Sequence, residues 1–242
     1  MEMERTKMRP AWRACVGILF AVLAASGVAL RPACAWAGCP ASVLTYWFHF
    51  QGGDTWVPAT AFDTTIVNAD GDTTRVGFDR AAARIWLHAI GREWAGERVL
   101  ERFDVTGVPE GTPVQATIVL TLEGQVYNSC GGGGCGSHFG ATVATATDST
   151  FADASIPGPC DDCTRPVSTT MTLPVTLTAG APVDAAFALL YHTTYVAYGR
   201  AFVTATYGVS GLPPGVRAVE CSEADVTPAR TRTWGRLKAA YR

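Results

Sequence analysis

Segments in which apolar and polar residues alternate recur along this chain, and this pattern is the feature that most constrains its fold. The clearest example is Val114–Leu122 (VQATIVLTL). The same alternation recurs in Ala141–Ala146, Val167–Leu177, Ala186–Tyr195, Arg200–Tyr207 and Val216–Cys221. A period of two is typical of β-strands that bury one face. These segments therefore predict strands rather than amphipathic helices.

The first part of the chain adds further strand candidates. Val43–Phe50 is aromatic and β-prone, and Thr64–Asn68 and Thr73–Phe78 flank an Asp-Gly turn that predicts a hairpin. The segments Arg84–Ile90 and Glu97–Val105 fit two strands, but Asp79–Phe103 also fits a helix interrupted by Gly91 and Gly96. Each glycine would cost such a helix about 1 kcal/mol, so we predict two strands there instead.

About ten strands with Gly, Pro and Asp turns and no interleaved helix indicate an antiparallel β-sandwich, either jelly-roll or immunoglobulin-like. We expect residues 38–227 to form this one domain, because 205 of the 242 residues remain after residues 1–37 are removed.

Residues 1–37 have the features of a cleaved secretory signal peptide. Four basic residues precede an apolar run, Ala14–Leu30, and small residues around Trp36 offer cleavage sites. A retained membrane anchor is the alternative, since 17 residues reach the lower limit for spanning a bilayer. A lipoprotein with lipidated Cys39 is a third reading, although Trp36 stands where Leu is expected. We expect export to the cell envelope or the medium.

The charge of the exported part is uneven. It carries 14 basic and 19 acidic side chains, and five of the basic ones lie in the last 13 residues. The body that precedes this tail is therefore near −10, which argues against nucleic acid as a partner. We expect membrane contact only through the signal peptide or, weakly, through the basic tail.

Six cysteines remain after cleavage, and an even number in an exported chain predicts disulfides that staple the fold. Cys39 and Cys221 bracket the domain, so we expect them to pair. The other four lie in two predicted loops and are expected to pair locally or between the loops; they are Cys130, Cys135, Cys160 and Cys163. Four thiolates holding zinc near His138 is the alternative, which an oxidising compartment disfavours.

Two phrases carry a resemblance to known proteins. Phe103–Val114 (FDVTGVPEGTPV) leads into an alternating strand, and Gly211–Val216 (GLPPGV) forms a late turn. Together they resemble poorly characterised secreted bacterial β-sandwich domains over roughly Ala82–Cys221. The resemblance implies a fold and an exported location, and it implies no activity.

Residues 228–242 form a basic C-terminal tail. Trp234, Leu237 and Tyr241 would share one face of a short helix. The string is similar to a Thr-Trp-Gly-x-Leu-Lys ending of exported bacterial proteins. It is either a frayed terminus or a docking tag.

Candidate ligand-binding residues are few. No nucleophile elbow, zinc-protease, phosphate-loop or dinucleotide motif occurs, so we expect no catalytic residue, metal or cofactor. His49, His88 and His192 fall in predicted strands, and His138 lies in a glycine-rich loop with the best access. Asn68–Asp72 is rich in oxygen ligands but lacks the spacing of a calcium loop, and so predicts a turn. Four tryptophans are candidates for a sugar-stacking platform: Trp47, Trp56, Trp86 and Trp94.

The sequence therefore predicts a secreted or cell-surface β-sandwich with a non-enzymatic structural or adhesive role, its partner a cell-surface glycan or an envelope protein. The alternatives are a carbohydrate-binding module, which requires exposed tryptophans, and a jelly-roll hydrolase, which requires converging acids or a histidine with a nucleophile.

Overall fold

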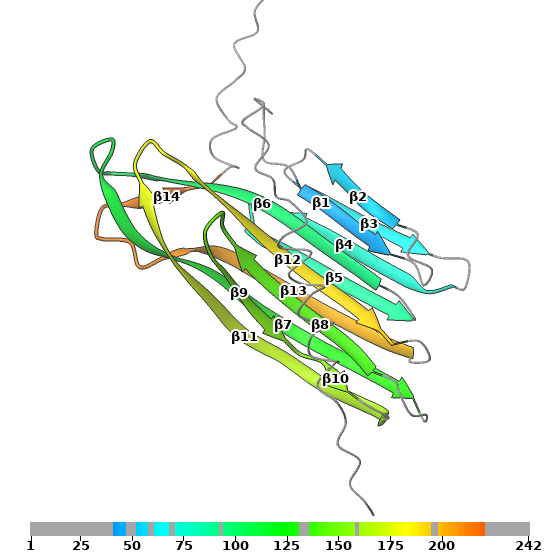
Figure 1. Ribbon diagram of the computed structural model, residues 1–242. Coiled ribbons are helices and arrows are strands. Elements are labelled where there is room, and N and C mark those ends of the chain that lie inside the picture. Colours follow the sequence, from blue (N-terminus) through cyan, green and yellow to red (C-terminus); the bar gives the residue numbers. More distant parts are fainter. Residues whose placement is uncertain are drawn as a thin grey trace, which may run out of the picture. The chain divides into compact units, whose positions relative to one another are not determined.

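The strands form two antiparallel sheets (Figure 1). Alternation gives the strands an apolar face, and the buried side chains form one core between the sheets. The computed structural model describes residues 41–46, 52–57, 61–67, 71–91, 94–130, 136–157, 160–194 and 198–220. Those residues form fourteen strands and no helix, within one compact unit, Ala37–Arg242. The predicted all-β antiparallel sandwich is confirmed.

Each sheet has a simple order. The six-stranded sheet runs β11 (Cys160–Thr178), β7 (Pro113–Cys130), β13 (Tyr198–Ser210), β5 (Arg84–Gly91), β4 (Thr73–Asp79), β3 (Ala61–Val67). The eight-stranded sheet runs β10 (Ile156–Pro157), β8 (Gly136–Ala144), β12 (Val183–Thr193), β6 (Trp94–Thr106), β1 (Ala41–Tyr46), β2 (Gly52–Val57). In addition, β9 (Ser149–Asp153) pairs with β8, and β14 (Arg217–Val219) pairs with β6.

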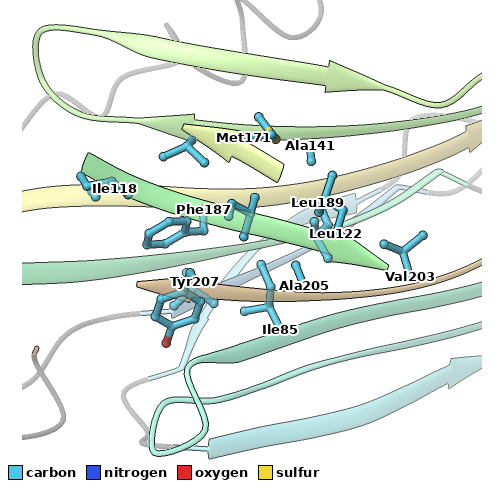
Figure 2. Close-up of a cluster of buried hydrophobic side chains, with 14 of the residues drawn as sticks. Ile85, Ile118, Leu122, Ala141, Met171, Phe187, Leu189, Val203, Ala205 and Tyr207 are labelled. Carbon is cyan, nitrogen blue, oxygen red and sulfur yellow. The ribbon is translucent and has the colours of Figure 1, made fainter. Parts of the chain in front are cut away.

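The core lies between the inner faces of the two sheets. Figure 2 shows side chains of both sheets meeting there, with Leu122 and Val203 from one sheet and Ala141 and Leu189 from the other. The ring of Phe187 on β12 stacks on that of Tyr207 on β13, with centroids 4.6 Å apart. Packing of this kind accounts for most of the stability of a sandwich.

Two local predictions are confirmed. The stretch that also fitted a helix forms β5 and β6, with Gly91 at a positive φ of 117° where β5 ends. The predicted Asp-Gly hairpin joins β3 to β4, where Val67 pairs with Thr73.

The prediction that the cysteines lie in loops was wrong for three of them. Cys130 ends β7, whereas Cys160 and Cys163 lie at the start of β11. The surrounding prolines indicated a loop, but β11 forms the edge of its sheet, and an edge strand tolerates residues that cannot donate a ladder hydrogen bond. The register also shifts between Cys160 and Cys163, which marks a β-bulge.

Candidate functional site

The outer face of the six-stranded sheet carries a cluster of aromatic and charged side chains on β3, β4 and β5. Strand register sets their positions: Asp63 lies opposite Gly77, and Gly77 lies opposite Trp86. In the neighbouring row, Arg75 lies opposite His88. Because side chains alternate between the two faces of a strand, these residues point away from the core, whereas Val76, Ile85 and Leu87 point into it.

These residues line an open hollow of about 450 Å³, which we call the Trp86 hollow. Its lining comes from four neighbouring strands and consists of Ala61, Phe62, Asp63, Arg75, Phe78, Asp79, Arg84, Trp86, His88 and Thr204. Four of these residues are apolar and six are polar or charged, so the hollow is more polar than most small-molecule pockets and suits a polar ligand.

The absence of a side chain at Gly77 determines where the Trp86 indole lies. A Cβ atom at this position would overlap Cζ2 of Trp86 and the carbonyl oxygen of Phe62. The indole therefore lies over the backbone of β4 and stays half-buried. A ring held in this way offers a flat surface at little entropic cost to a ligand.

The polar groups of the hollow are oriented by one another. Arg75 holds Asp63 through two hydrogen bonds, Nε to Oδ1 at 2.8 Å and Nη2 to Oδ2 at 2.6 Å, although both side chains are nearly half exposed. These bonds lower the pKa of Asp63, so its carboxylate stays ionised. Burial and the charge of Arg75 lower the pKa of His88, so its imidazole is neutral at neutral pH. The site thus offers paired charges and a neutral ring with one donor and one acceptor.

A buried carboxyl lies on the core side of the same strands. Glu97 on β6 is 1% exposed, and its Oε2 accepts a hydrogen bond of 3.2 Å from the backbone N–H of Gly77. Burial raises the pKa of Glu97 well above its ordinary value, so the group holds its proton at a pH where an exposed glutamate would be ionised.

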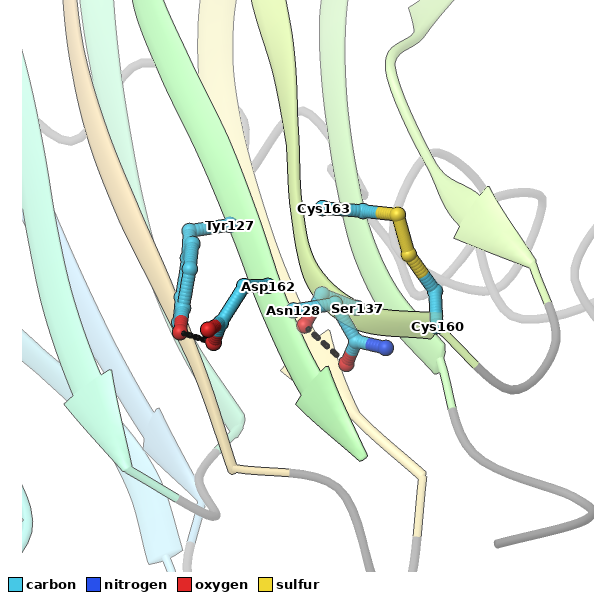
Figure 3. The surroundings of a disulfide bond; sticks show 6 residues. All are labelled: Tyr127, Asn128, Ser137, Cys160, Asp162 and Cys163. Atoms are coloured by element: carbon cyan, nitrogen blue, oxygen red, sulfur yellow. Dashed lines mark hydrogen bonds between the residues drawn. A yellow bond between two sulfur atoms is a disulfide. The ribbon is translucent and has the colours of Figure 1, made fainter. Parts of the chain in front are cut away.

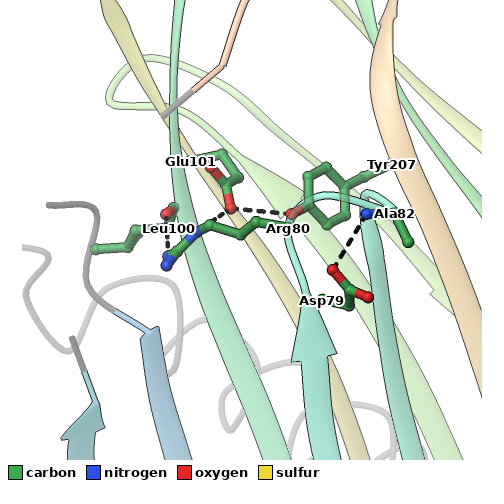
Figure 4. Close-up of polar contacts among 6 residues, drawn as sticks. All are labelled: Asp79, Arg80, Ala82, Leu100, Glu101 and Tyr207. Carbon is green, nitrogen blue, oxygen red and sulfur yellow. Dashed lines mark hydrogen bonds and ion pairs between the residues drawn. The ribbon is translucent and has the colours of Figure 1, made fainter. Parts of the chain in front are cut away.

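A second buried glutamate on the same face of β6, Glu101, forms an ion pair with an arginine. Arg80 Nε donates to Glu101 Oε1 at 2.6 Å, and the hydroxyl of Tyr207 donates to the same oxygen at 2.9 Å (Figure 4). Arg80 also donates to the carbonyl of Leu100 and lies over the ring of Phe78. This group ties the two sheets together from within the core.

Sequence reasoning missed both glutamates, although the sequence carries a signal for them. Glu97 and Glu101 have the same parity in β6 as Val99, Phe103 and Val105, so a strict period of two places them on the apolar face.

Further along the outer face of the same sheet, a group of rings surrounds Arg200. Its guanidinium lies 5.3 Å from the ring centre of Tyr127 and 5.8 Å from that of Tyr198. The hydroxyl of Tyr127 donates to Asp162, which occupies the bulge between Cys160 and Cys163 (Figure 3). The two cysteines form a disulfide with each other.

His138 lies in β8, not in the accessible loop that the sequence predicted. It is 7% exposed and stacks on its cross-strand neighbour His192, with ring centroids 4.6 Å apart. Burial and the neighbouring His138 lower the pKa of His192 to about 3, and burial also lowers that of His138. The loop prediction failed because the glycines at 136 and 140 lie within a central strand.

The three described tryptophans of the proposed platform belong to two different sheets. Trp86 belongs to β5 in the six-stranded sheet, whereas the backbones of Trp56 and Trp94 belong to β2 and β6 in the eight-stranded sheet. Trp47 lies outside the described residues. Of the four, Trp86 lines the hollow.

Several other predictions fall outside the described residues: the signal peptide, residues 1–37; Cys39, Cys135 and Cys221; His49; and Trp234, Leu237 and Tyr241 in the tail. Within the described ranges, there is no helix long and apolar enough to cross a membrane, and no group of three or more potential metal ligands.

Comparison with known proteins adds no assignment to this geometry. No protein-family model matches the chain, and no curated protein is similar enough to count as a relative.

Proposed function

We propose that this protein is an exported, non-enzymatic β-sandwich that binds carbohydrate at the cell surface, with the Trp86 hollow as its binding site. The observation that carries the proposal is the position of the Trp86 indole beside the Arg75–Asp63 pair. The C–H face of a sugar ring stacks on an aromatic surface, and its hydroxyls need both donors and acceptors. Arg75 supplies donors, Asp63 supplies acceptors, and His88 supplies one of each.

The charge of the hollow supports a neutral ligand. Arg75 is compensated by Asp63, and Asp79 lies opposite Arg84 in the register of β4 and β5. A strongly charged ligand would need an excess of one sign in the site. A polyhydroxylated neutral ligand needs none.

The titration of the hollow supports binding rather than hydrolysis. A glycoside hydrolase needs a carboxyl that holds its proton near neutral pH beside a second carboxylate. Arg75 has the opposite effect on Asp63, whose pKa is lowered. Asp79 Oδ1 accepts the backbone N–H of Ala82 and so helps to form the turn that follows β4.

Affinity electrophoresis through gels that contain soluble polysaccharides, such as xylan, β-glucan and glycol chitin, tests the proposal. We expect at least one polysaccharide to retard the wild type, and Trp86→Ala to abolish the retardation. Phe151→Ala is the matched control, because Phe151 is a 46% exposed aromatic residue on a strand of the other sheet. Equal retardation of the wild type and Trp86→Ala, or no retardation by any polysaccharide, would overturn the assignment of this site. Release of reducing sugar by the wild type would overturn its non-enzymatic part.

Export is tested separately. Intact mass of the protein recovered from the envelope or the medium should show cleavage near Ala37 and no lipid on Cys39. Recovery of the full-length chain from the cytoplasm would contradict an exported location.

A further inference from the structure

We propose that the ligand site continues from the Trp86 hollow along the outer face of β13 to the rings around Arg200, and that it therefore takes an extended, neutral glycan chain rather than a single terminal sugar. This inference rests on the proposed function and specifies its ligand. We call the continuous surface the β13 track; its two ends are the Trp86 hollow and the Arg200 cluster (Tyr127, Tyr198 and Arg200).

The track is continuous because its successive residues either contact each other or lie side by side on the outer face of β13. His88, at the edge of the hollow, meets Phe202 edge to face at 5.6 Å between ring centres. Phe202 and Arg200 are two residues apart on β13 and so share its outer face. Arg200 in turn lies over the rings of Tyr127 and Tyr198.

The length of the track decides the kind of ligand. Thr204 lines the hollow and Tyr198 begins the strand, so the track runs over six residue steps of β13, or roughly 20 Å at about 3.3 Å per step. One sugar ring is far shorter than this. A chain of several sugars would use the stacking surfaces at both ends.

The far end of the track is held in place before any ligand arrives. Asp162 adopts a left-handed backbone with φ of 59°, inside the four-residue loop closed by the Cys160–Cys163 disulfide. This conformation, which costs energy for a residue other than glycine, brings the carboxylate to the hydroxyl of Tyr127 and so orients the ring. Fixing a ring in advance reduces the entropy lost on binding.

The exposure of the Arg200 cluster agrees with a contact surface. Tyr198 is 38% exposed, and Arg200 is also exposed. Tyrosine and arginine side chains concentrate binding energy where they lie together on a surface. Asp162 beside Tyr127 supplies a carboxylate near the Arg200 cation, so this end, like the hollow, combines both signs of charge.

Titration calorimetry with cello-, xylo- and chito-oligosaccharides of two to six sugars tests the inference. For a series that binds, we expect affinity to rise about tenfold or more from the disaccharide to the hexasaccharide. Arg200→Ala and Tyr198→Ala should leave the disaccharide Kd within about twofold and remove most of that rise. Trp86→Ala should weaken binding at every length. Arg102→Ala, an exposed arginine on the other sheet, is the matched control.

Three outcomes separate the inference from the proposed function. Binding that depends on Trp86 but not on chain length would overturn the track and leave the hollow as a site for one sugar. Equal loss at all lengths in Arg200→Ala would also overturn it, because Arg200 would then act on the fold or the hollow. If no oligosaccharide binds, the proposed function fails and the track with it. Thermal unfolding of each variant shows whether a loss of binding is a loss of folding.

The disulfide gives an independent check. Replacing Cys160 and Cys163 together by Ala frees the bulge and should lower affinity for the hexasaccharide with little effect on the disaccharide. An unchanged hexasaccharide affinity in this variant would show that the bulge does not prepare the far end of the track.

Discussion

Glu97 and Glu101 lie four residues apart on the same face of β6, and each is 1% exposed, yet the two regions around them differ in kind. Glu101 meets the guanidinium of Arg80 and the hydroxyl of Tyr207. Glu97 accepts the backbone N–H of Gly77 from the core side, and the Trp86 indole lies over the same glycine on the outer face. Equal burial therefore accompanies an ion pair between the sheets in one place, and a carboxyl of raised pKa behind a candidate binding site in the other.

The difference shows two ways in which the cost of burying a carboxyl group is reduced in this sandwich. An isolated buried charge costs several kcal/mol, and either a cation or a proton can remove that cost. Arg80, just after β4, compensates Glu101 and so stabilises the closed end of the β4–β5 hairpin. Protonation compensates Glu97, so the stability of that region depends on pH.

Removing the carboxylate of the buried Arg80–Glu101 pair should have the largest effect on stability. Glu101→Ala leaves Arg80 3% exposed without its carboxylate, and we expect a loss of about 3–5 kcal/mol in the free energy of unfolding. Equilibrium denaturation in urea measures it. A loss below about 1 kcal/mol would contradict the view that this buried pair stabilises the contact between the sheets.

Glu97 should destabilise the fold as pH rises. Its folded-state pKa lies above the ordinary value of 4.5, so above pH 4.5 the unfolded chain releases this proton while the folded chain keeps it. Stability then falls by about 1.4 kcal/mol per pH unit until the folded-state pKa is reached. Glu97→Gln keeps an oxygen acceptor for Gly77 and should be the more stable protein at pH 8. Parallel pH profiles of urea unfolding for the variant and the wild type would refute this interpretation.

Gly77→Ala tests whether the hollow depends on the position of the Trp86 indole over Gly77. The new methyl group overlaps the indole of Trp86 and the carbonyl of Phe62, so we expect a loss of about 1–3 kcal/mol and weaker ligand binding. Denaturation and affinity electrophoresis together measure both effects. If binding is unchanged, the indole does not need the position over Gly77 that the structure assigns to it.

Asp184→Ala breaks an exposed ion pair, in contrast to the buried Arg80–Glu101 pair, and should have the smallest effect on stability. Its partner Arg102 follows Glu101 directly on β6 but points to the opposite face, and this pair is 36% to 54% exposed. Solvent screens such pairs, so we expect a change of about 0–1 kcal/mol in urea denaturation. A loss as large as that of Glu101→Ala would mean that burial is not what separates the two pairs.

Much of the fold could be predicted because strand alternation is local information. Val114–Leu122 falls within β7, and the Asp-Gly hairpin and the strands of the ambiguous segment are where the sequence predicted them. The prediction of loops around Cys160 failed because prolines disfavour central strands but not an edge strand.

The candidate site was only partly predictable, for a physical reason. Period two shows that Trp86 leaves the core, but it does not show that the backbones of Trp86 and Trp56 belong to different sheets. The Arg80–Glu101 and Arg200–Tyr127 contacts join residues more than 20 positions apart, and such contacts depend on strand order and on how the two sheets pack. Glu97 and Glu101 could have been recognised, because their parity matched that of buried neighbours.

The central claim is that ligand binds the outer face of the six-stranded sheet at Trp86. The most direct test follows the indole N–H signals in 15N-labelled protein by NMR, assigned by single Trp→Phe variants, during titration with the glycan that retards the wild type. We predict that the Trp86 signal shifts most, and that the signals of Trp56 and Trp94 change little. Large shifts at Trp56 or Trp94 with Trp86 unchanged would place the binding face on the other sheet and contradict this account.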